Sequence, residues 1–336
     1  MNKILKRVLI AITIFISILV FFFIPEKAET WGFYTHKLIN RHAVFTLPPG
    51  MIGFYKNHLE YITEHAIDPD RRSHGVTGEA ERHYCDIDYY GPSPFDSVPK
   101  TWKAAVAKYT EDTLRANGIL PWNIEKFTLN LTQAFRDMDA DKILYYSANI
   151  GHYIADATVP LHNTQYYNGK TPQQKGIHAF WESRIPEMLA KDYTFFVGRA
   201  EYIKDPLGRA WELMKQSHYE IDTIFAIEEY LRNNFPNDKK FVIQERGATI
   251  QKQYSREYTL EFDKLSHYMV KRKINIAIFN VGSYWYTAWV NAGQPDLKSI
   301  EDKQISKAHK KELKEIDKMW KTGKPIGRPN PVESEK

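Results

Sequence analysis

The stretch from Gly151 to Glu187, GHYIADATVPLHNTQYYNGKTPQQKGIHAFWESRIPE, decides what fold is expected of the whole chain. Its first half holds His152 and Asp156, four residues apart, so the two side chains share one face if this part is helical. Pro160 then ends the helix, because proline lacks the N–H needed to continue the ladder. His162 follows just past that bend.

A second pair with the same spacing, His178 and Glu182, follows on what the pattern predicts to be the next helix. One such pair alone is more often a surface or capping pair than a ligand pair. Here, however, the neighbouring residues indicate that these side chains are buried, and burying an ionisable group costs folding free energy unless the group is paired or bound to a metal. The apolar neighbours that indicate burial are Ile154, Ala155, Ala157, Val159, Leu161, Phe180 and Trp181. Imidazole and carboxylate ligands without cysteine suit zinc in a catalytic rather than a structural site.

The N-terminus has the layout of an export signal. Lys3, Lys6 and Arg7 precede a continuous apolar run, residues 8–24, and a short polar stretch then ends at Thr30. The run of 17 residues lies near the lower limit for spanning a bilayer, so an uncleaved anchor is the alternative. We therefore expect an exported protein that is periplasmic, secreted or membrane-anchored through this segment.

Composition excludes some classes of function. The formal net charge is +5, of which residues 1–30 carry +2, and the remainder is too mild to argue for nucleic acid or anionic lipid as a partner. Cys85 is the only cysteine, so no internal disulfide can form and the fold must depend on its core and on metal.

Other ligand candidates lie ahead of the central stretch. Trp31 could chelate a metal through its free amine and its carbonyl oxygen if cleavage follows Thr30, with His36 close by; the alternative is that Trp31 is a core aromatic residue and His36 an ordinary helical one. Two aspartates in the Asp68-Pro69-Asp70 turn either cap a helix or point into a site. His83 is a further candidate. The nearby Asp86 is read as a partner that fixes an imidazole or as a turn residue, and Asp88 as a turn residue.

The remaining pattern predicts an all-α protein, and we find no alternating strand pattern. We expect one multi-helix domain over residues 31–295, an export segment at 1–30 and a charged C-terminal tail at 296–336, with disorder expected over 321–336. The expected helices are 37–65 (interrupted at 48–50), 102–116, 124–138, 142–157 with Asp141 as N-cap, 205–233 as one or two helices, 241–258, 262–292 and an exposed helix at 300–320.

Four motifs then resemble a known superfamily, the zinc-dependent phospholipases C of bacteria and the single-strand-specific zinc nucleases of fungi and plants. They are W-G-x-x-x-H from Trp31, an aspartate ahead of H-Y-x-D-I-D from His83, G-H-Y-x-x-D-x-x-x-P-x-H from Gly151 and G-x-H-x-x-x-E from Gly176. The resemblance covers Trp31 to about Ala292. It implies a mostly helical fold with three zinc ions in a cleft.

The resemblance also implies which residues bind each ion. The first zinc would be bound by Asp68, His83, His152 and Asp156, the second by His162, His178 and Glu182, and the third by Trp31 and His36 with Asp156 bridging. Asp68 is preferred over Asp70 because it fits a D-x-x-R pattern with Arg71. As the catalytic carboxylate, Asp68 would also orient the attacking water or accept its proton. Tyr84, directly after His83, is expected to line the substrate pocket.

Three functions stay open at this point. The first is a phospholipase C-like zinc hydrolase of phosphodiester bonds, which the His-x-x-x-Glu pair and the lack of disulfides favour. The second is a single-strand-specific nuclease of the same fold, whose bases would need an aromatic platform. The third is a non-catalytic exported zinc-binding surface protein. The expected partners are a phospholipid or single-stranded nucleic acid substrate and a membrane surface, and we expect a monomer.

Overall fold

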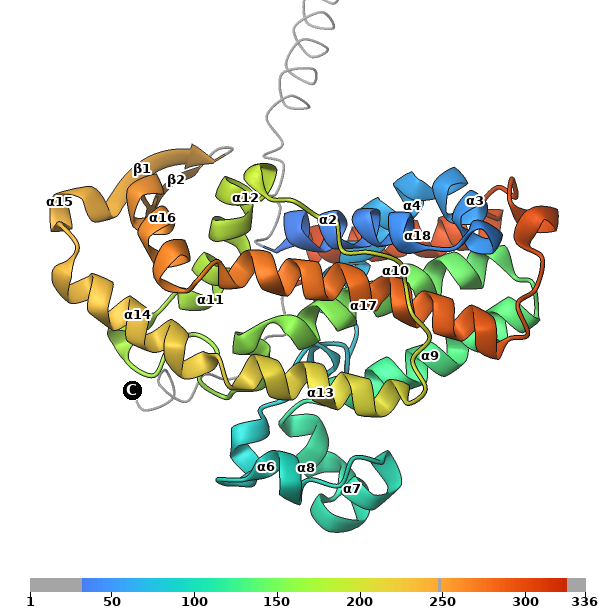
Figure 1. Cartoon of the computed structure of the whole chain (residues 1–336), viewed down its shortest axis with the longest axis horizontal. Helices are drawn as coiled ribbons and strands as arrows, with labels where there is room; N and C mark the ends of the chain where they lie inside the picture. The colour runs from blue at the N-terminus through green and yellow to red at the C-terminus, as the bar shows by residue number, and fades with distance from the viewer. Residues whose placement is uncertain (1–31, 247–248, 325–336) are drawn as a thin grey trace, which may run out of the picture.

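Long helices packed side by side make the body of the molecule (Figure 1). The computed structural model describes residues 32–246 and 249–324, so Trp31 and the export segment lie outside the described residues. The long helices are α2 (Phe33–Ala43), α9 (Leu120–Arg136), α10 (Ala140–Thr158), α13 (Pro206–His218), α14 (Ile221–Asn234), α16 (Arg256–Leu265), α17 (Met269–Asn291) and α18 (Lys307–Thr322). The mostly helical fold is confirmed.

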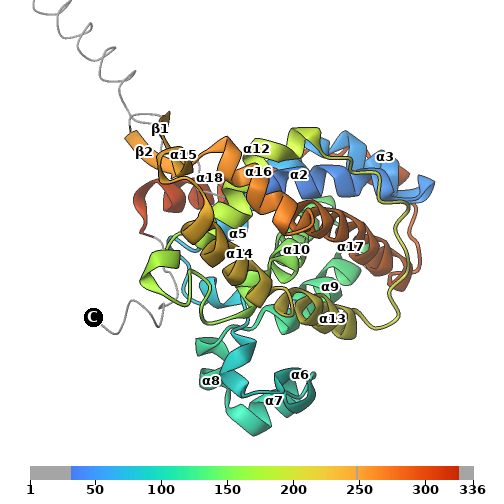
Figure 2. The ribbon, with the colours of Figure 1, turned by 60° about the vertical axis from the view of Figure 1, so that its left-hand side comes forward.

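Shorter helices connect and cover these. They are α3 (Pro49–Asn57), α4 (Leu59–Glu64), α5 (Asp68–Arg72), α6 (Pro94–Ser97), α7 (Trp102–Tyr109), α8 (Glu111–Ala116), α11 (Ile177–Ala179), α12 (Ile185–Leu189) and α15 (Asn237–Lys240). Helices α6, α7 and α8 form a lobe below the body, as both ribbon views show (Figures 1 and 2). No helix within the described ranges is long and apolar enough to cross a membrane.

Helix α10 is the central element, packed against α9, α17 and α2. Its close approach to α2 requires glycine at position 151, because a Cβ there would collide with the side chain of Asn40. The Asn40 amide also donates hydrogen bonds to the carbonyl oxygens of Ala148, at 3.0 Å, and Ile62, at 3.3 Å. On the other side, Trp285 of α17 donates to the Ser147 carbonyl at 3.0 Å. These contacts fix the helix that carries His152 and Asp156.

The predicted helix over 241–258 is wrong. Strands β1 (Phe241–Arg246) and β2 (Thr249–Tyr254) form an antiparallel hairpin there, and α16 begins only at Arg256. Val242, Ile243, Thr249 and Ile250 are β-branched, which favours a pleated strand over a helix, and a glycine lies between the two runs.

Other helix boundaries also differ. The expected helix 102–116 is broken between α7 and α8 at Thr110, whose φ is 68° and whose side chain caps α8. The expected helix 262–292 is broken at His267 and Tyr268, both with positive φ. Asp139, not Asp141, caps α10 by accepting a hydrogen bond from the Lys142 N–H at 3.2 Å.

The C-terminal helix α18 begins at Lys307 and is amphipathic rather than fully exposed. Its Trp320 is 7% exposed and packs against Phe33 of α2, with ring centroids 5.3 Å apart. His309 of the same helix contacts Tyr61, with Nε2 and the hydroxyl 2.6 Å apart. Part of the predicted charged tail therefore belongs to the packed body.

Candidate metal centre

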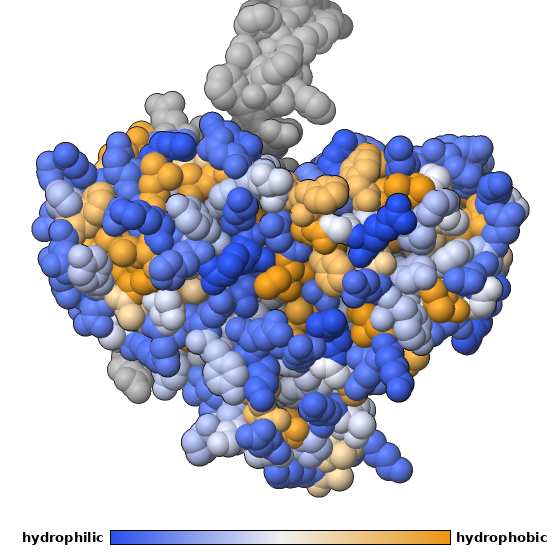
Figure 3. Space-filling view, viewed as in Figure 1, coloured by the Kyte–Doolittle hydropathy of each residue, from blue (hydrophilic) through white to orange (hydrophobic). Residues whose placement is uncertain are grey.

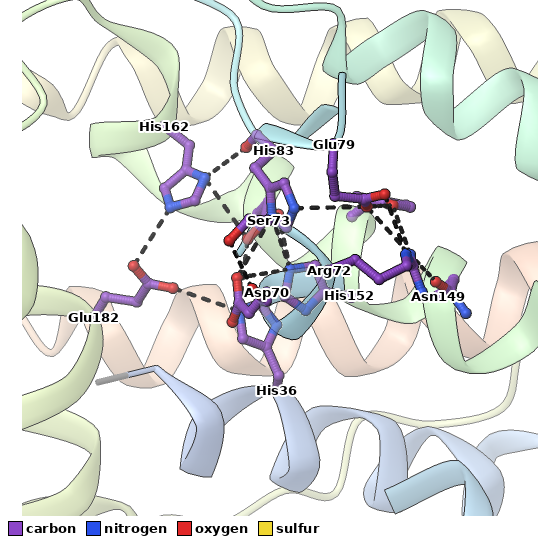
Figure 4. A network of polar contacts seen from close by, with 12 residues as sticks. His36, Asp70, Arg72, Ser73, Glu79, His83, Asn149, His152, His162 and Glu182 are labelled. Atoms are coloured by element: carbon purple, nitrogen blue, oxygen red, sulfur yellow. Dashed lines mark hydrogen bonds and ion pairs between the residues drawn. The ribbon is translucent and has the colours of Figure 1, made fainter. Parts of the chain in front are cut away.

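The candidate ligands come from separate segments and meet at one place inside the body (Figure 4). Most of these segments are short, and α10 is the long helix around which they gather. The residues are His36 from α2, Asp70 from α5, His83 directly after the short helix Ala80–Arg82, His152 and Asp156 from α10, His162 from the turn Pro160–Asn163, His178 from α11 and Glu182 from the π-helical segment Phe180–Arg184.

Asp156 lies at the centre. Its Oδ2 is 3.1 Å from His83 Nδ1 and 3.3 Å from His152 Nε2. Its Oδ1 is 3.5 Å from His36 Nε2 and 3.6 Å from His162 Nδ1. One fully buried carboxylate thus faces four imidazoles, which is the position expected of a bridging ligand.

Glu182 forms a second centre. Its Oε2 is 2.8 Å from His178 Nε2 and 3.4 Å from His162 Nε2, and its Oε1 is 3.4 Å from His36 Nε2. The π-helical segment Phe180–Arg184 that carries Glu182 is a geometry often found at functional sites. His36 therefore contacts both carboxylate centres and joins them.

Asp70, rather than Asp68, reaches the cluster. Asp70 Oδ1 is 3.5 Å from His152 Nε2 and 3.6 Å from His83 Nδ1. Its side chain is 32% exposed, so this carboxylate also faces solvent.

Asp68 is directed elsewhere. Its carboxylate contacts His65 Nδ1 at 2.8 Å and Arg71 Nη1 at 3.4 Å, and the residue is 2% exposed. The Arg71 that supported Asp68 in the sequence pattern is thus its ion-pair partner. The geometry favours Asp70 as the ligand, against the choice made from the sequence, because both aspartates lie in α5 and side chains two residues apart on a helix do not share a face.

The hydrogen bonds of the histidines test whether a cation fits. His152 Nδ1 is 2.8 Å from the Ala66 carbonyl, and His162 Nδ1 is 2.6 Å from the His83 carbonyl. A carbonyl oxygen only accepts, so both Nδ1 atoms carry hydrogen. In the neutral imidazoles the Nε2 lone pairs then face His83 Nδ1 at 3.0 Å and Glu182 Oε2 at 3.4 Å. A lone pair directed at a second ligand-type atom at these distances is what metal ligands present, and a backbone hydrogen bond at the other nitrogen is the usual support.

The electrostatics of the cluster agree with a site for positive charge. Burial raises the pKa of Asp156 and Glu182, but the neighbouring histidines outweigh it and hold both values well below the usual range. Burial lowers the pKa of His36 and His83, but hydrogen bonds and the carboxylates outweigh it and raise both. Burial, followed by the charge of His36, lowers the pKa of His152.

A buried ion-pair network lies directly behind His83 and was not expected from the sequence. Arg72 donates from Nε and Nη2 to the two oxygens of Glu79, both at 3.1 Å, and Arg82 donates to the same carboxylate at 2.9 Å. Tyr153 also donates to Glu79, and Glu79 Oε1 is 3.8 Å from His83 Nε2. Glu79 precedes His83 by four residues, the spacing of the recognised pairs, and that signal could have found it.

Two other predicted residues have structural surroundings. Tyr84 is 8% exposed and lies against Gly118, where a Cβ would collide with the tyrosine ring and carbonyl. This placement gives no support to a role in contacting substrate. Asp88 accepts hydrogen bonds from Thr164 Oγ1 at 2.7 Å and Gln165 N–H at 3.0 Å, so it fixes the loop that follows His162.

Comparison with known proteins agrees with this geometry. A family model described as zinc-dependent phospholipase C matches residues 35–242, well over half of the chain. The matched stretch holds every described candidate ligand from His36 to Glu182. A search of curated proteins found no match.

Proposed function

The chain belongs to the zinc-dependent phospholipase C family, and from that premise we propose that it hydrolyses the phosphodiester bond of phospholipids. The observation that carries the proposal is the buried cluster in which imidazole lone pairs and carboxylates face one another around Asp156. Such a cluster is costly without a cation. It suits a phosphodiester, whose reaction develops negative charge.

The donor set divides into groups that fit zinc. Nitrogen and oxygen donors without sulfur are typical of catalytic zinc sites. We assign Asp70, His83, His152 and Asp156 to the first ion, His162, His178 and Glu182 to the second, and His36 with Asp156 and Glu182 to a third. Trp31 stays a prediction for the third site. Bound zinc ions would neutralise phosphate charge and lower the pKa of water toward about 7.

The protein's own residues hold and orient this chemistry. Asp156 and Glu182 are anchored on α10 and on the π-helical segment, so their carboxylates are fixed before substrate arrives. Asp70 is the member of the first group that is also partly exposed. We assign to Asp70 the role earlier given to Asp68, orienting a water molecule or accepting its proton.

A paired assay tests the proposal. Purified protein loaded with zinc should hydrolyse phosphatidylcholine and leave single-stranded DNA intact. Cleavage of DNA alone would establish the nuclease alternative. A zinc-loaded protein inert on both, and on a soluble phosphodiester, would support the non-catalytic alternative.

Export belongs to the same proposal. We propose that residues 1–30 direct the chain out of the cytoplasm and that cleavage before Trp31 frees its amine for zinc. Mass spectrometry of the exported protein should find Trp31 first. An N-terminal extension should then remove one zinc ion, whereas a fully active protein with a different first residue would show that Trp31 is not a ligand.

A further inference from the structure

The hairpin of β1 and β2 projects from one end of the molecule beside α12 and α16 (Figures 1 and 2). It carries exposed aliphatic side chains. Ile243 and Ile250 are each 72% exposed and Val242 is 40% exposed. The surface at this end shows hydrophobic colour next to hydrophilic colour (Figure 3). Aliphatic side chains gathered at an exposed hairpin end are unusual on a monomer and indicate a contact surface.

The register places these side chains on both faces of the hairpin. Ile243 pairs with Lys252, so Ile250 lies diagonally from Ile243 on the same face. Val242 alternates to the opposite face. Val242 lies near the base of the hairpin, where its partner Gln253 is buried, so the exposed aliphatic pair is Ile243 and Ile250 on one face.

The charge of this segment complements an anionic surface. Residues 236–256 hold five basic residues and two acidic ones, although the whole chain carries only +5. Lys239 and Lys252 are exposed, and Lys252 Nζ lies 4.1 Å from the centre of the Phe241 ring. Lysines beside aliphatic side chains can extend their ammonium groups to lipid phosphates while their stems stay in apolar surroundings.

The base of the hairpin is attached to the metal-site segment. Arg184, two residues after Glu182, donates from Nε and Nη2 to the Tyr254 carbonyl at 3.3 and 3.2 Å and from Nη1 to Gln244 Oε1 at 3.1 Å. Phe180 of the same segment packs on the Tyr254 ring with centroids 4.5 Å apart. A hairpin held in this way keeps the site in a fixed position relative to whatever its tip contacts.

We propose that the exposed aliphatic side chains of the β1–β2 hairpin insert into the surface of an anionic phospholipid bilayer and hold the metal site next to the lipid headgroups. This inference rests on the proposed function for the choice of lipid as occupant. Insertion would bury Ile243 and Ile250, while Lys239 and Lys252 contact anionic headgroups.

Vesicle binding tests this directly. The zinc-loaded protein is mixed with vesicles of phosphatidylcholine and phosphatidylglycerol and sedimented. The double variant Ile243→Thr/Ile250→Thr keeps β-branched residues in the strands and should weaken binding about tenfold, because it removes aliphatic burial. Leu129→Gln is the matched control, since Leu129 is 64% exposed on α9 away from the hairpin and should leave binding unchanged. Equal binding by the double variant and the parent would overturn the proposal.

A second measurement does not depend on the double variant folding. Cys85 is buried, so an Ile250→Cys variant can be labelled selectively with an environment-sensitive fluorophore. Its emission should shift to the blue on adding vesicles and be quenched by brominated lipid. An unchanged spectrum would contradict insertion, and concentration-dependent dimerisation without vesicles would assign the hairpin to a second copy of the chain instead.

Activity separates this inference from the proposed function. The double variant should lose hydrolysis of vesicle lipid while keeping full turnover of a water-soluble phosphodiester such as p-nitrophenyl phosphorylcholine. If the parent binds vesicles but hydrolyses neither substrate, the proposed function fails and the docking surface stands. If the parent hydrolyses both and the double variant matches it on vesicles, the docking surface fails and the function stands.

Discussion

Two buried charged clusters share His83, and they differ in how their charges are matched. On one side, Glu79 accepts hydrogen bonds from Arg72, Arg82 and Tyr153, so donors meet an acceptor. On the other side, Nε2 of His152 faces Nδ1 of His83, so two ring nitrogens meet. The first cluster holds its own cations, and the second places acceptors where a cation would fit.

The difference teaches how a metal site can be recognised without its metal. Burial alone does not separate the two clusters, because Glu79 and Asp156 are both fully buried. Ion pairing alone does not separate them either, since both carboxylates lie near nitrogen atoms. The two clusters differ in whether their nitrogen atoms carry hydrogen. The guanidinium groups around Glu79 always have hydrogen to donate. A neutral imidazole whose Nδ1–H donates to a carbonyl oxygen, as in the second cluster, has only a lone pair at Nε2.

The largest effect is expected from removing the charge of Asp156, the carboxylate at the centre of the metal-ligand cluster. Asp156→Asn keeps the size of the side chain but removes the charge that faces His36, His83, His152 and His162. We expect loss of bound zinc and a fall in phosphodiesterase activity of at least about 10³-fold. Elemental analysis and kinetics on a soluble substrate measure both. Full zinc content with full activity would show that this carboxylate is not a ligand.

The second largest effect is expected from removing the carboxylate of the Glu79 ion-pair network. Glu79→Ala leaves the buried guanidinium group of Arg72 and the partly exposed one of Arg82 without their carboxylate, which should cost about 3–5 kcal/mol of unfolding free energy. Urea denaturation measures it. The matched control is Glu111→Ala, which removes an exposed ion pair with Arg115 and should cost less than about 1 kcal/mol. Similar losses for both variants would mean that burial of the network adds nothing.

Glu79→Gln, as the conservative variant, tests the link between the two clusters. If the Glu79 carboxylate orients the His83 ring by contacting its Nε2 atom, the Glu79→Gln protein should fold but bind zinc about 10–100-fold more weakly than the parent. Zinc affinity equal to that of the parent would make Glu79 purely a stability residue.

A smaller effect distinguishes the two aspartates of the turn. Asp70→Asn should lower activity about 10–100-fold, because Asp70 faces His83 and His152 at the edge of the cluster. Asp68→Asn should leave catalysis unchanged and cost about 1 kcal/mol of stability, because it weakens the contacts with His65 and Arg71. The reverse order in the kinetics of the two variants would restore Asp68 as the catalytic carboxylate.

The sequence predicted the parts of this site that repeat a local spacing. His152 with Asp156 and His178 with Glu182 are pairs four residues apart, and both are in the clusters because a helical turn aligns them. The choice between Asp68 and Asp70 has no such local signal. Two aspartates two residues apart differ only in the direction that α5 gives each side chain, and that direction depends on its packing against the rest of the fold.

The fold shows the same division. Long amphipathic helices such as α9 and α10 were predicted because their apolar period extends over several turns. The β1–β2 hairpin was missed because Ile243 and Ile250 are exposed while the polar Gln253 is buried, so no alternation of apolar and polar residues marks a buried face. The Arg72–Glu79 network was missed although Glu79 precedes His83 by four residues, because its other partners, Asn149 and Tyr153, lie in a segment distant in sequence.

The smallest expected effect is a change in melting temperature with pH when zinc is removed. In the metal-free protein His36 and His83 have raised pKa values, so their protonation stabilises the fold below pH 6.5, and this contribution is lost as pH rises through the folded values. The lowered pKa of His152 changes the pH dependence of folding stability in the opposite direction, but it involves one histidine, whereas the raised pKa values involve two. Zinc replaces these protons and binds more tightly as pH rises. Chelation should therefore lower the melting temperature by a few degrees at pH 6 and by about twice as much at pH 8, measured by scanning calorimetry on the same preparation.

The Glu79 network, which keeps its protons across this range, should contribute equally to stability at both pH values. A shift independent of pH would mean that the histidines do not exchange protons for metal, and the contrast between the two clusters would then lose its basis.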